Sequence, residues 1–439
     1  MEDTVFALSS GQGRAGIAVI RVSGDRARLA LETLTGRVAP PSRRASVRRL
    51  VDPANGEQLD EALVLWLTGP ATVTGEDMAE LHVHGSRAVV GGVLDALGAL
   101  EGLRLAEPGE FTRRAFANGR MDLTQVEGLA DLIDAETAGQ RRLALAQAQG
   151  ALAARCSEWR TRLVRALALV EAEIDFSDEE LPDGLDDQAL SMVMGVAQEI
   201  REVVATGPRG ELMRDGVQVA ILGPPNVGKS SLLNRLAGRE AAIVSDISGT
   251  TRDIVEVTLD LGGVPVVLAD TAGLRETDDP VEREGISRAR ARASASDIAV
   301  WVIDLADPAP PVWPEGLQAA RRVVVGNKGD VGDTSFPCDL VVSATSGSGM
   351  DDLERFLADA AQDLAGGADG STLVSRVRQR EALGDCLACL DRACEEAWGE
   401  AALAGEEIRL GLRALGRLVG RVDVDDILDV IFRDFCIGK

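Results

Sequence analysis

The stretch Val217-Gln-Val-Ala-Ile-Leu-Gly-Pro-Pro-Asn-Val-Gly-Lys-Ser-Ser231 decides the fold of this chain. Its first six residues form a mostly apolar run typical of a short buried strand. A glycine-rich turn follows, and Ser231-Leu-Leu-Asn-Arg-Leu-Ala237 has the pattern of a helix. The turn matches the phosphate-binding loop, in which Gly-x4-Gly-Lys-Ser joins a strand to a helix. The sequence therefore predicts an α/β domain built around a nucleotide site.

The chemistry of that loop assigns roles to its residues. Backbone N–H groups close around the phosphates, Lys229 reaches the β- and γ-phosphate oxygens, and the Ser230 hydroxyl binds Mg²⁺. Lys229 is one of three lysines among 46 basic residues, with Lys328 and Lys439. Since a guanidinium and an ammonium differ in chemistry, the three retained lysines point to sites. The other loop residues expected at the nucleotide are Asn226, Val227, Gly228 and Ser231.

Two motifs downstream complete the phosphate end of the site. Gly249-Thr-Thr-Arg-Asp253 offers Thr251 as a second Mg²⁺ ligand. Asp270-Thr-Ala-Gly273 ends a strand, so that Asp270 can hold the Mg²⁺ shell while the N–H of Gly273 meets the γ-phosphate. Thr271 and Ala272 lie between them in the same contact.

Asn327-Lys-Gly-Asp330 selects the base, because Asp330 can accept both N1–H and the exocyclic amine of guanine. Adenine lacks that pair of donors and would leave a buried carboxylate unpaired. Lys328 would lay its alkyl stem along the base, and the backbone of Ser343-Ala344 suits the guanine O6. The expected nucleotide is GTP rather than ATP.

One residue type is missing from the expected catalytic set. Many small GTPases place Gln directly after the Asp-Thr-Ala-Gly motif to orient the attacking water, but here that position is Leu274. Either another group organises the water or hydrolysis is slow. Glu282 could act through a second water, although a glutamate in this setting, taken by itself, is more often an ordinary solvated helix residue.

The rest of the chain surrounds this domain with helical sequence. Residues 1 to about 118 mix short strands with helices, and residues 119 to about 208 are almost wholly helical in pattern. Thr206-Gly-Pro-Arg-Gly210 is expected to end that helical stretch. Strands and helices alternate from about 216 to 363, with a hairpin about Gly262-Gly263. Since helical sequence resumes from 373 to 435, the α/β domain is predicted to be inserted into a helical domain.

Composition limits the partners and the cellular location that we expect for the chain. A net charge of −25 over 439 residues argues against a large nucleic-acid interface. The start Met-Glu-Asp-Thr lacks a basic signal region, and no apolar run approaches the ~20 residues of a membrane span, so we expect a cytoplasmic chain without a membrane partner. Cys386, Cys389 and Cys394 lack the remaining ligands of a metal site and are predicted to be small buried thiols.

The ordered motifs and the end of the chain resemble the bacterial tRNA-modification GTPases that act on the wobble uridine. The resemblance spans the whole chain and is carried by the GTP motifs, by Leu274-Arg275, and by Glu110-Phe-Thr-Arg-Arg-Ala-Phe116. Asp131-Leu-Ile-Asp-Ala-Glu136 and the terminal Cys436-Ile-Gly-Lys439 belong to it as well. It implies a multidomain α/β and all-α protein, in which a Ras-like P-loop G domain is inserted into a helical domain. The implied segments are an N-terminal α+β folate-binding and dimerisation domain (1–118), a helical domain in two parts (119–213 and 371–439) and the G domain (214–370).

The resemblance also implies a K⁺ ion in the G domain. Asn226 would hold it with the backbone near Ser245 and Ile247 and with Thr250. This ion would stand where other systems place an arginine finger, and two G domains would meet face to face around it. Glu282 matches the water-organising glutamate of the family.

For a tetrahydrofolate derivative the matching positions are Arg21, Glu80, residue 120 and Lys439. Residue 120 is Arg, where the family often has Lys, so this contact is expected to be altered; an arginine can still pair with a folate carboxylate. An alternative for this region is a metal site at Glu80-x-His82-x-His84, whose side chains share one strand face.

Cys436 has three interpretations. Prenylation is disfavoured because Lys439 is an atypical last residue and no polybasic stretch precedes it. A structural thiol and a site residue near the folate stay open, and the second is preferred because the tail would have to fold back for Lys439 to reach that pocket.

The predicted function is that of a dimeric, K⁺- and Mg²⁺-dependent GTPase. By resemblance it would work in a heterotetramer with an FAD- and NADH-dependent partner subunit that supplies most of the tRNA-binding surface. Together they would add an aminomethyl or carboxymethylaminomethyl group at C5 of the wobble uridine. Two rivals remain: a ribosome-assembly regulatory GTPase, and a folate-binding methyl-transfer enzyme with a vestigial G domain.

Overall fold

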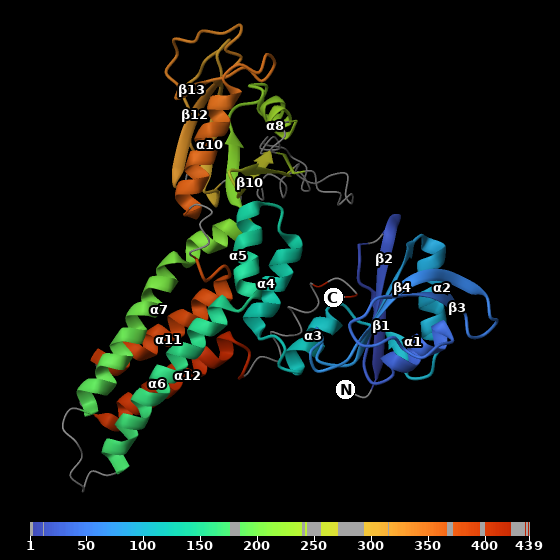
Figure 1. The fold of residues 1–439 in the computed structure, drawn as a ribbon. Coiled ribbons are helices and arrows are strands. Elements are labelled where there is room, and N and C mark those ends of the chain that lie inside the picture. Colours follow the sequence, from blue (N-terminus) through green and yellow to red (C-terminus); the bar gives the residue numbers. More distant parts are fainter. Residues whose placement is uncertain are drawn as a thin grey trace, which may run out of the picture. The chain divides into compact units, whose positions relative to one another are not determined.

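The chain forms two compact units in a computed structural model. One unit comprises Met1–Glu127 with Val419–Lys439, and the other comprises Gly128–Leu418. An N-terminal α+β part, a helical part and a P-loop α/β part are present, as the sequence predicts (Figure 1). The boundaries of the four predicted segments stay predictions. The structure describes residues 3–11, 13–175, 185–238, 242–243, 256–270, 294–314, 316–366, 372–395, 400–422, 435 and 438.

The N-terminal unit is built on a six-stranded sheet in the order β3-β4-β5-β2-β1-β6. Alternate residues of β4 are buried, such as Ala62, Val64 and Trp66, because one face of the sheet is covered by α1 and α2. Phe111 of α3 packs with Val5 and Ala7 of β1 in a separate small cluster. The elements are β1 (Thr4–Leu8), β2 (Ala15–Ser23), α1 (Ala27–Thr35), β3 (Ser46–Val51), β4 (Gln58–Leu67), β5 (Met78–Gly85), α2 (Arg87–Gly98), β6 (Leu103–Leu105) and α3 (Glu110–Ala117).

A buried ionic network holds α3 in this unit. The side chain of Arg114 is fully buried and donates to Glu110 Oε1 at 2.9 Å and to Glu76 Oε2 at 3.1 Å. It also donates to the backbone oxygen of Asp3 at 3.0 Å. Arg104 donates to the same Glu110 oxygen at 2.6 Å. Because buried charges are costly when unpaired, the two buried members, Arg114 and Glu110, depend on these partners.

The C-terminal residues complete the same unit. The N–H of Leu123 donates to the carbonyl of Val419 at 3.3 Å. Gly420 has a φ of +80°, and a Cβ there would lie 2.8 Å from the ring of Phe116, so only glycine fits. Further along, the Ser9 hydroxyl donates to the carbonyl of Gly438 at 2.7 Å. Gly438 therefore lies beside the end of β1.

The second unit contains a helical bundle in which α6 packs on α7 and α12, and α11 packs on the same two helices (Figure 1). Trp159 of α6 is fully buried and its indole N–H donates to Glu199 of α7 at 2.9 Å. The helices are α4 (Leu123–Asp134), which begins in the N-terminal unit, α5 (Ala138–Ala148), α6 (Ala151–Asp175), α7 (Leu185–Asp215), α11 (Val377–Glu395) and α12 (Ala401–Leu418).

The predicted end of the helical stretch at Thr206–Gly210 is wrong. α7 continues to Asp215 with Pro208 inside it. The glycines serve packing instead: a Cβ on Gly207 would lie 2.8 Å from the Arg380 side chain, and one on Gly210 would lie 1.9 Å from the carbonyl of Val374. Both residues are glycine because α11 and the segment before it pack closely against α7 here.

The inserted α/β part has a seven-stranded sheet in the order β13-β12-β11-β7-β10-β9-β8. The five strands from β13 to β10 are parallel, and β9 is antiparallel to β10. Leucines of α8 and α10 pack with β7 and β10 in one core, while Leu317 and Trp313 pack with Ala220 and Trp301 in another. The elements are β7 (Val217–Leu222), α8 (Lys229–Ala237), β8 (Ala242–Ile243), β9 (Glu256–Leu261), β10 (Val264–Asp270), β11 (Ile298–Asp304), β12 (Arg321–Asn327), β13 (Leu340–Val341) and α10 (Met350–Ala365).

The ionic network predicts how the N-terminal unit responds to acid. Burial by itself raises the pKa of Glu110, but hydrogen bonds from Arg104, the Glu107 amide and Arg114 outweigh it and lower the pKa below its ordinary 4.5. A lowered folded-state pKa stabilises the fold above the unfolded-state pKa, and this stabilisation is lost as the pH falls below about 4.5. We expect Glu110→Gln to lower the unfolding free energy of this unit by about 1.5–3 kcal/mol at pH 7.

Hydrogen exchange of the β1 and α3 amides as a function of pH measures this effect in the full chain. The variant should also show a flatter decline of stability below about pH 4.5 than the wild type. Glu107→Gln is the matched control, because the Glu107 side chain is 66% exposed. Equal pH profiles for the wild type and Glu110→Gln would contradict the prediction.

Candidate functional site

The phosphate-binding loop has the backbone shape that its sequence predicts. Gly223, Asn226 and Gly228 have φ values of +141°, +66° and +96°. A Cβ on Gly223 would lie 2.5 Å from the carbonyl of Val302, so the loop runs close to the end of β11. Helix α8 begins at Lys229, directly after the loop, and its first N–H groups are suited to anions.

Lys229 lies within the curve of this loop. Its ammonium donates to the carbonyls of Gly223 at 2.9 Å and Pro224 at 2.8 Å. Ser230 and Ser231 are exposed at the start of α8, and the exposed Asn226 stands at the turn of the loop. The loop thus combines an ammonium, hydroxyls and a helix N-terminus, which are the groups that a triphosphate with a divalent cation requires.

Asn327 joins three of the predicted motifs. It is the last residue of β12, and its side chain is only 2% exposed. Its amide nitrogen donates to the carbonyl of Val227 in the phosphate-binding loop at 2.9 Å, and its amide oxygen accepts from the N–H of Ala344 at 3.1 Å. A Cβ on Gly228 would lie 2.3 Å from that amide nitrogen, so the loop approaches Asn327 closely.

The base-recognition segments lie side by side beyond Asn327. The N–H of Gly329 donates to the carbonyl of Val342 at 3.0 Å, which places Lys328 and Asp330 next to Ser343 and Ala344. Asp330 is exposed, and Ser343 is buried. Lys328 adopts a φ of +62° and forms an ion pair with Asp304.

Asp304 was not anticipated from the sequence. Burial raises its pKa, but hydrogen bonds from Lys328 and the Ala306 amide and the charge of Lys328 outweigh this, and the net direction is downward. Asp304 is the last residue of β11, as Asn327 is of β12, and this position at the carboxyl edge of the sheet is the signal that could have found it.

Several predicted residues lie outside the described part of the chain. For Asp270 only the backbone position is described: it is the last residue of β10, and it pairs with Ile221 of β7, next to the phosphate-binding loop. The others are Ser245, Ile247, Thr250, Thr251, Thr271, Ala272, Gly273, Leu274, Glu282, Cys436 and Lys439.

The N-terminal unit brings two of the predicted folate residues together. Arg21 of β2 and Glu80 of β5 are cross-strand neighbours, and the Arg21 guanidinium donates to Glu80 Oε1 at 3.1 Å. The guanidinium also lies over the ring of Phe111, 5.7 Å from its centroid. Both side chains are partly exposed, at 21% and 17%. The pair offers a planar donor and a carboxylate acceptor on the sheet.

Arg120 is held by a neighbouring segment. It is exposed and donates through Nε to the carbonyl of Thr72 at 3.2 Å. Thr74 two residues on shares a 2.7 Å hydrogen bond with Ser23 of β2, whose hydroxyl also donates to Glu76. The segment around Thr72–Glu76 therefore connects Arg120 to β2, and this connection had no signal in the sequence.

The described residues contradict the alternative prediction that Glu80, His82 and His84 together bind a metal ion. His82 lies 3.4 Å from Glu80, but His84 pairs with Asp60 at 2.8 Å. Among the described residues no group of three or more His, Cys, Asp or Glu side chains is arranged to hold a metal ion. Cys386 and Cys389 are buried free thiols and Cys394 is partly buried; burial, with smaller contributions from Cys389 and Cys156, raises the pKa of Cys386.

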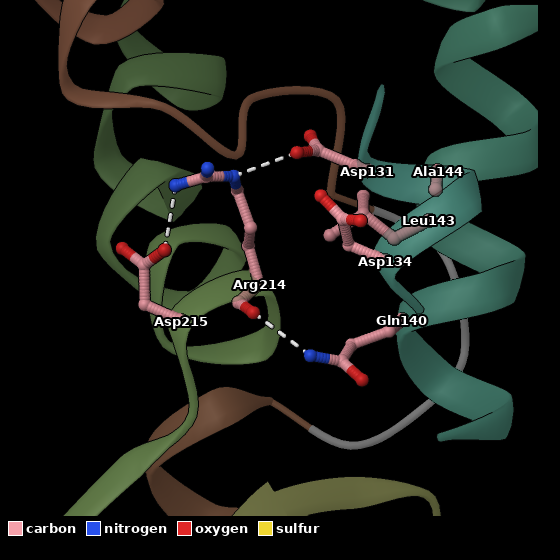
Figure 2. Close-up of a pocket in the computed structure, with 7 residues that line it drawn as sticks. All are labelled: Asp131, Asp134, Gln140, Leu143, Ala144, Arg214 and Asp215. Atoms are coloured by element: carbon pink, nitrogen blue, oxygen red, sulfur yellow. Dashed lines mark hydrogen bonds and ion pairs between the residues drawn. The ribbon is translucent and has the colours of Figure 1, made fainter. Parts of the chain in front are cut away.

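A hollow of about 80 Å³ lies apart from the predicted nucleotide and folate residues, where α4, α5 and the end of α7 meet (Figure 2), and its lining includes Asp131 and Asp134 of the motif at residues 131–136. Arg214 donates from Nε to Asp131 at 2.8 Å and from Nη1 to Asp215 at 2.6 Å. Burial raises the pKa of Asp215 despite the charge of Arg214 beside it. The lining residues are Asp131, Asp134, Gln140, Leu143, Ala144, Arg214 and Asp215.

Comparisons with known proteins agree with these motifs. A family model described as the MnmE helical domain matches residues 123–436, and one described as the GTP-binding protein TrmE N-terminus matches residues 4–120. A tRNA modification GTPase MnmE of Parvibaculum lavamentivorans is 54% identical over 443 residues, covering 100% of both chains. This chain belongs to the MnmE family of tRNA modification GTPases.

Other MnmE relatives cover the chain equally well. The tRNA modification GTPase MnmE of Rhodospirillum rubrum is 51% identical and covers 100% of this chain and 99% of its own. Among solved structures, an Aquifex aeolicus Era variant bound to GDP and AlF4⁻ covers 33% of this chain and 56% of that chain, with 26% identity and a TM-score of 0.26. The part of the chain that the structure describes contains no candidate membrane-spanning helix.

The bridging role of Asn327 leads to a prediction for the MnmE-type nucleotide site. Asn327→Ala would leave the Val227 carbonyl and the Ala344 N–H without their partner, at a cost of about 1–3 kcal/mol. We expect the dissociation constant for GTP to rise about tenfold, since 1.4 kcal/mol corresponds to a factor of ten.

Titration with a fluorescent GTP analogue measures the constant, and thermal unfolding shows whether the domain is intact. Asn234→Ala is the matched control, because Asn234 is exposed on α8. Unchanged affinity in Asn327→Ala would show that the bridge does not shape the site.

Proposed function

We propose that this chain is the GTP-hydrolysing subunit of a complex that modifies the wobble uridine of tRNA at C5. The observation that carries the nucleotide part is the Asn327 bridge, which joins the phosphate-binding loop to the base-recognition segments. Membership of the MnmE family supports the tRNA part. The group added would be aminomethyl or carboxymethylaminomethyl, with its one-carbon unit taken from methylene-tetrahydrofolate.

In the GTP site the protein would chiefly bind and orient. Lys229 would exchange its two carbonyl partners for phosphate oxygens, while Asp330 would accept from the guanine edge and Ser343-Ala344 would contact its O6. Thr271, Ala272 and Gly273 would lie at the γ-phosphate. Ser230 and Thr251, with Asp270 in the outer shell, would hold Mg²⁺, which neutralises phosphate charge when bound.

The residue that would position the attacking water lies outside the described part of the chain. Leu274 stands where many GTPases have Gln, so Glu282 would organise the water through a second water. Asn226, Ser245, Ile247 and Thr250 would hold K⁺, which supplies positive charge at the phosphates. Asn226 fits this role because its exposed amide stands at the turn of the loop with a φ of +66°. The G domains of a homodimer would meet at this surface.

Arg21, Glu80, Arg120 and Lys439 would bind the tetrahydrofolate derivative. A carboxylate such as Glu80 can accept the paired N–H donors of an aminopyrimidine ring, and Arg120 can pair with a carboxylate of the ligand. Support for a role of the tail comes from Gly438, which the Ser9 hydroxyl holds against the N-terminal sheet. Gly438, the residue before Lys439, thus contacts the unit that contains Arg21 and Glu80. Cys436 would lie near the same ligand.

The partners follow from charge and family. An FAD- and NADH-dependent subunit would join the homodimer in a heterotetramer and supply most of the tRNA-binding surface, which fits the net charge of −25. The complex would act in the cytoplasm. GTP hydrolysis would drive opening and closing of the G domains rather than the carbon chemistry.

Nucleoside analysis of tRNA tests the proposal. We expect a strain that lacks this gene to lose the wobble-uridine modification, the wild-type gene to restore it, and Lys229→Ala to fail. Mass spectrometry of digested tRNA gives the readout. Unchanged wobble uridines in the deletion strain would instead favour a regulatory GTPase of ribosome assembly. Absent GTP turnover would favour a folate enzyme with a vestigial G domain.

Potassium dependence tests the role of Asn226. Asn226→Gly keeps a residue that tolerates positive φ but removes the amide oxygen, so we expect kcat for GTP in KCl to fall about tenfold or more. Asn226→Asp tolerates the same φ and keeps an oxygen ligand, and it should retain most of the stimulation. The measurement is GTP hydrolysis in KCl and NaCl at equal ionic strength. Equal stimulation of Asn226→Gly and the wild type would exclude this ligand.

A further inference from the structure

The hairpin between β9 and β10 is seated on the first turn of α5. Its two-residue loop is Gly262-Gly263, with φ values of +69° and +89° that suit a tight hairpin turn. The carbonyl of Gly263 accepts two hydrogen bonds from the helix, at 2.8 Å from the Thr137 hydroxyl and at 3.0 Å from the Gly139 N–H. We call these three residues, Thr137, Gly139 and Gly263, the hairpin contact.

The hairpin contact leaves no spare room. Thr137 is 3% exposed, and a Cβ on Gly139 would lie 2.3 Å from the Gly263 carbonyl oxygen and 2.6 Å from the sulfur of Met213. The turn itself is fixed, because the Gly263 N–H donates to Asp260 Oδ1 at 2.7 Å. The backbone of α5 at Gly139 therefore lies directly against the backbone of the hairpin at Gly263.

The helix side of the contact is anchored in the helical bundle. Thr137 and Gln140 form a capping box at the start of α5. Gln140 also donates to the carbonyl of Arg214 at the end of α7 at 2.9 Å (Figure 2). Arg214 and Arg376 both donate to Asp131 of α4, so three helical segments and the segment before α11 share this junction.

The hairpin side leads to the nucleotide site. β10 runs from Val264, next to the contact, to Asp270; its residues 264–269 pair with β9 and its residues 266–270 pair with β7. A strand bonded on both edges is stiff, so a displacement of its first residue along the strand is carried to its last, ~20 Å away. The neighbouring β7 continues into the phosphate-binding loop.

We propose that Thr137 and Gly139 are positioning residues that couple the nucleotide site to the helical bundle through β10. The pair would fix where β10 stands, and hence where Asp270 stands, relative to α5. Nucleotide-dependent movement of the Asp270 end would in turn be felt by α5 at the hairpin contact. The inference rests on the proposed GTP-dependent function. It adds the contact through which a conformational change in the G domain would reach the helical bundle.

Two variants of the full chain separate coupling from stability. Gly139→Ala forces the helix and the turn apart, and Thr137→Val removes one hydrogen bond while keeping the shape of the side chain. Gly384→Ala is the matched control, since it adds the same methyl group to α11 where no atom lies within 4 Å. Thermal unfolding of all three, with the partner subunit absent, establishes that the chain is folded.

The readout is the ratio of tRNA modification to GTP hydrolysis in the complete complex. We expect Gly139→Ala to lower this ratio about tenfold, in the range of typical coupling energies, and Thr137→Val to lower it less. The GTP dissociation constant should change much less than this ratio, because the phosphate-binding loop follows β7 and Asn327 ends β12, and neither takes part in the hairpin contact. A ratio in Gly139→Ala equal to that of Gly384→Ala would overturn the inference.

Hydrogen exchange provides a second readout that needs no partner subunit and no turnover. In the wild type, a non-hydrolysable GTP analogue should change the exchange of amides in the first turn of α5, and in Gly139→Ala it should not. The same response in both proteins would refute coupling at this contact. A wild-type chain that binds GTP without supporting tRNA modification would refute the proposed function, while the exchange comparison would still decide the role of the hairpin contact.

Discussion

Parallel pairing of β7 with β10 and β11 is the constraint on which the nucleotide site depends. Because the carboxyl ends of parallel strands meet at one edge of a sheet, loops that are distant in sequence are brought together there. The phosphate-binding loop follows β7, Asp304 ends β11 and Asn327 ends β12. The Asn327 amide then links the phosphate-binding loop to the segment at Ala344 with two hydrogen bonds. Loss of this register would separate the motifs even though each kept its sequence.

The sequence was sufficient for the strands that carry these motifs. The range Val217–Leu222 is as predicted, since a short apolar run next to a glycine-rich turn leaves little choice. Gly262-Gly263 likewise predicts its hairpin correctly. In each case the decisive interactions are local, so that neighbouring residues contain the information.

Features that arise from packing between distant segments were not predictable. Glycine and proline at 206–210 suggested a helix end, but α7 continues through them, and Gly210 is where the segment near Val374 approaches the helix closely. The partner of Lys328 is Asp304, 24 residues away, and the network around Arg114 joins Asp3, Glu76 and Glu110. A single sequence shows residue types and spacings, but it does not show which distant side chains meet.

The hydrogen bond between Leu123 and Val419 has a consequence for the order of synthesis. Residues 128–418 form an insertion in the N-terminal unit. The chain leaves that unit and returns to it at nearly the same point, because Leu123 is hydrogen-bonded to Val419. Since chains emerge from the ribosome N-terminus first, the six-stranded sheet is made long before Gly420, Phe435 and Gly438 exist. The inserted unit is complete while its host still lacks these residues. The N-terminal unit, although first in sequence, is therefore the last part of the chain to acquire its full set of contacts.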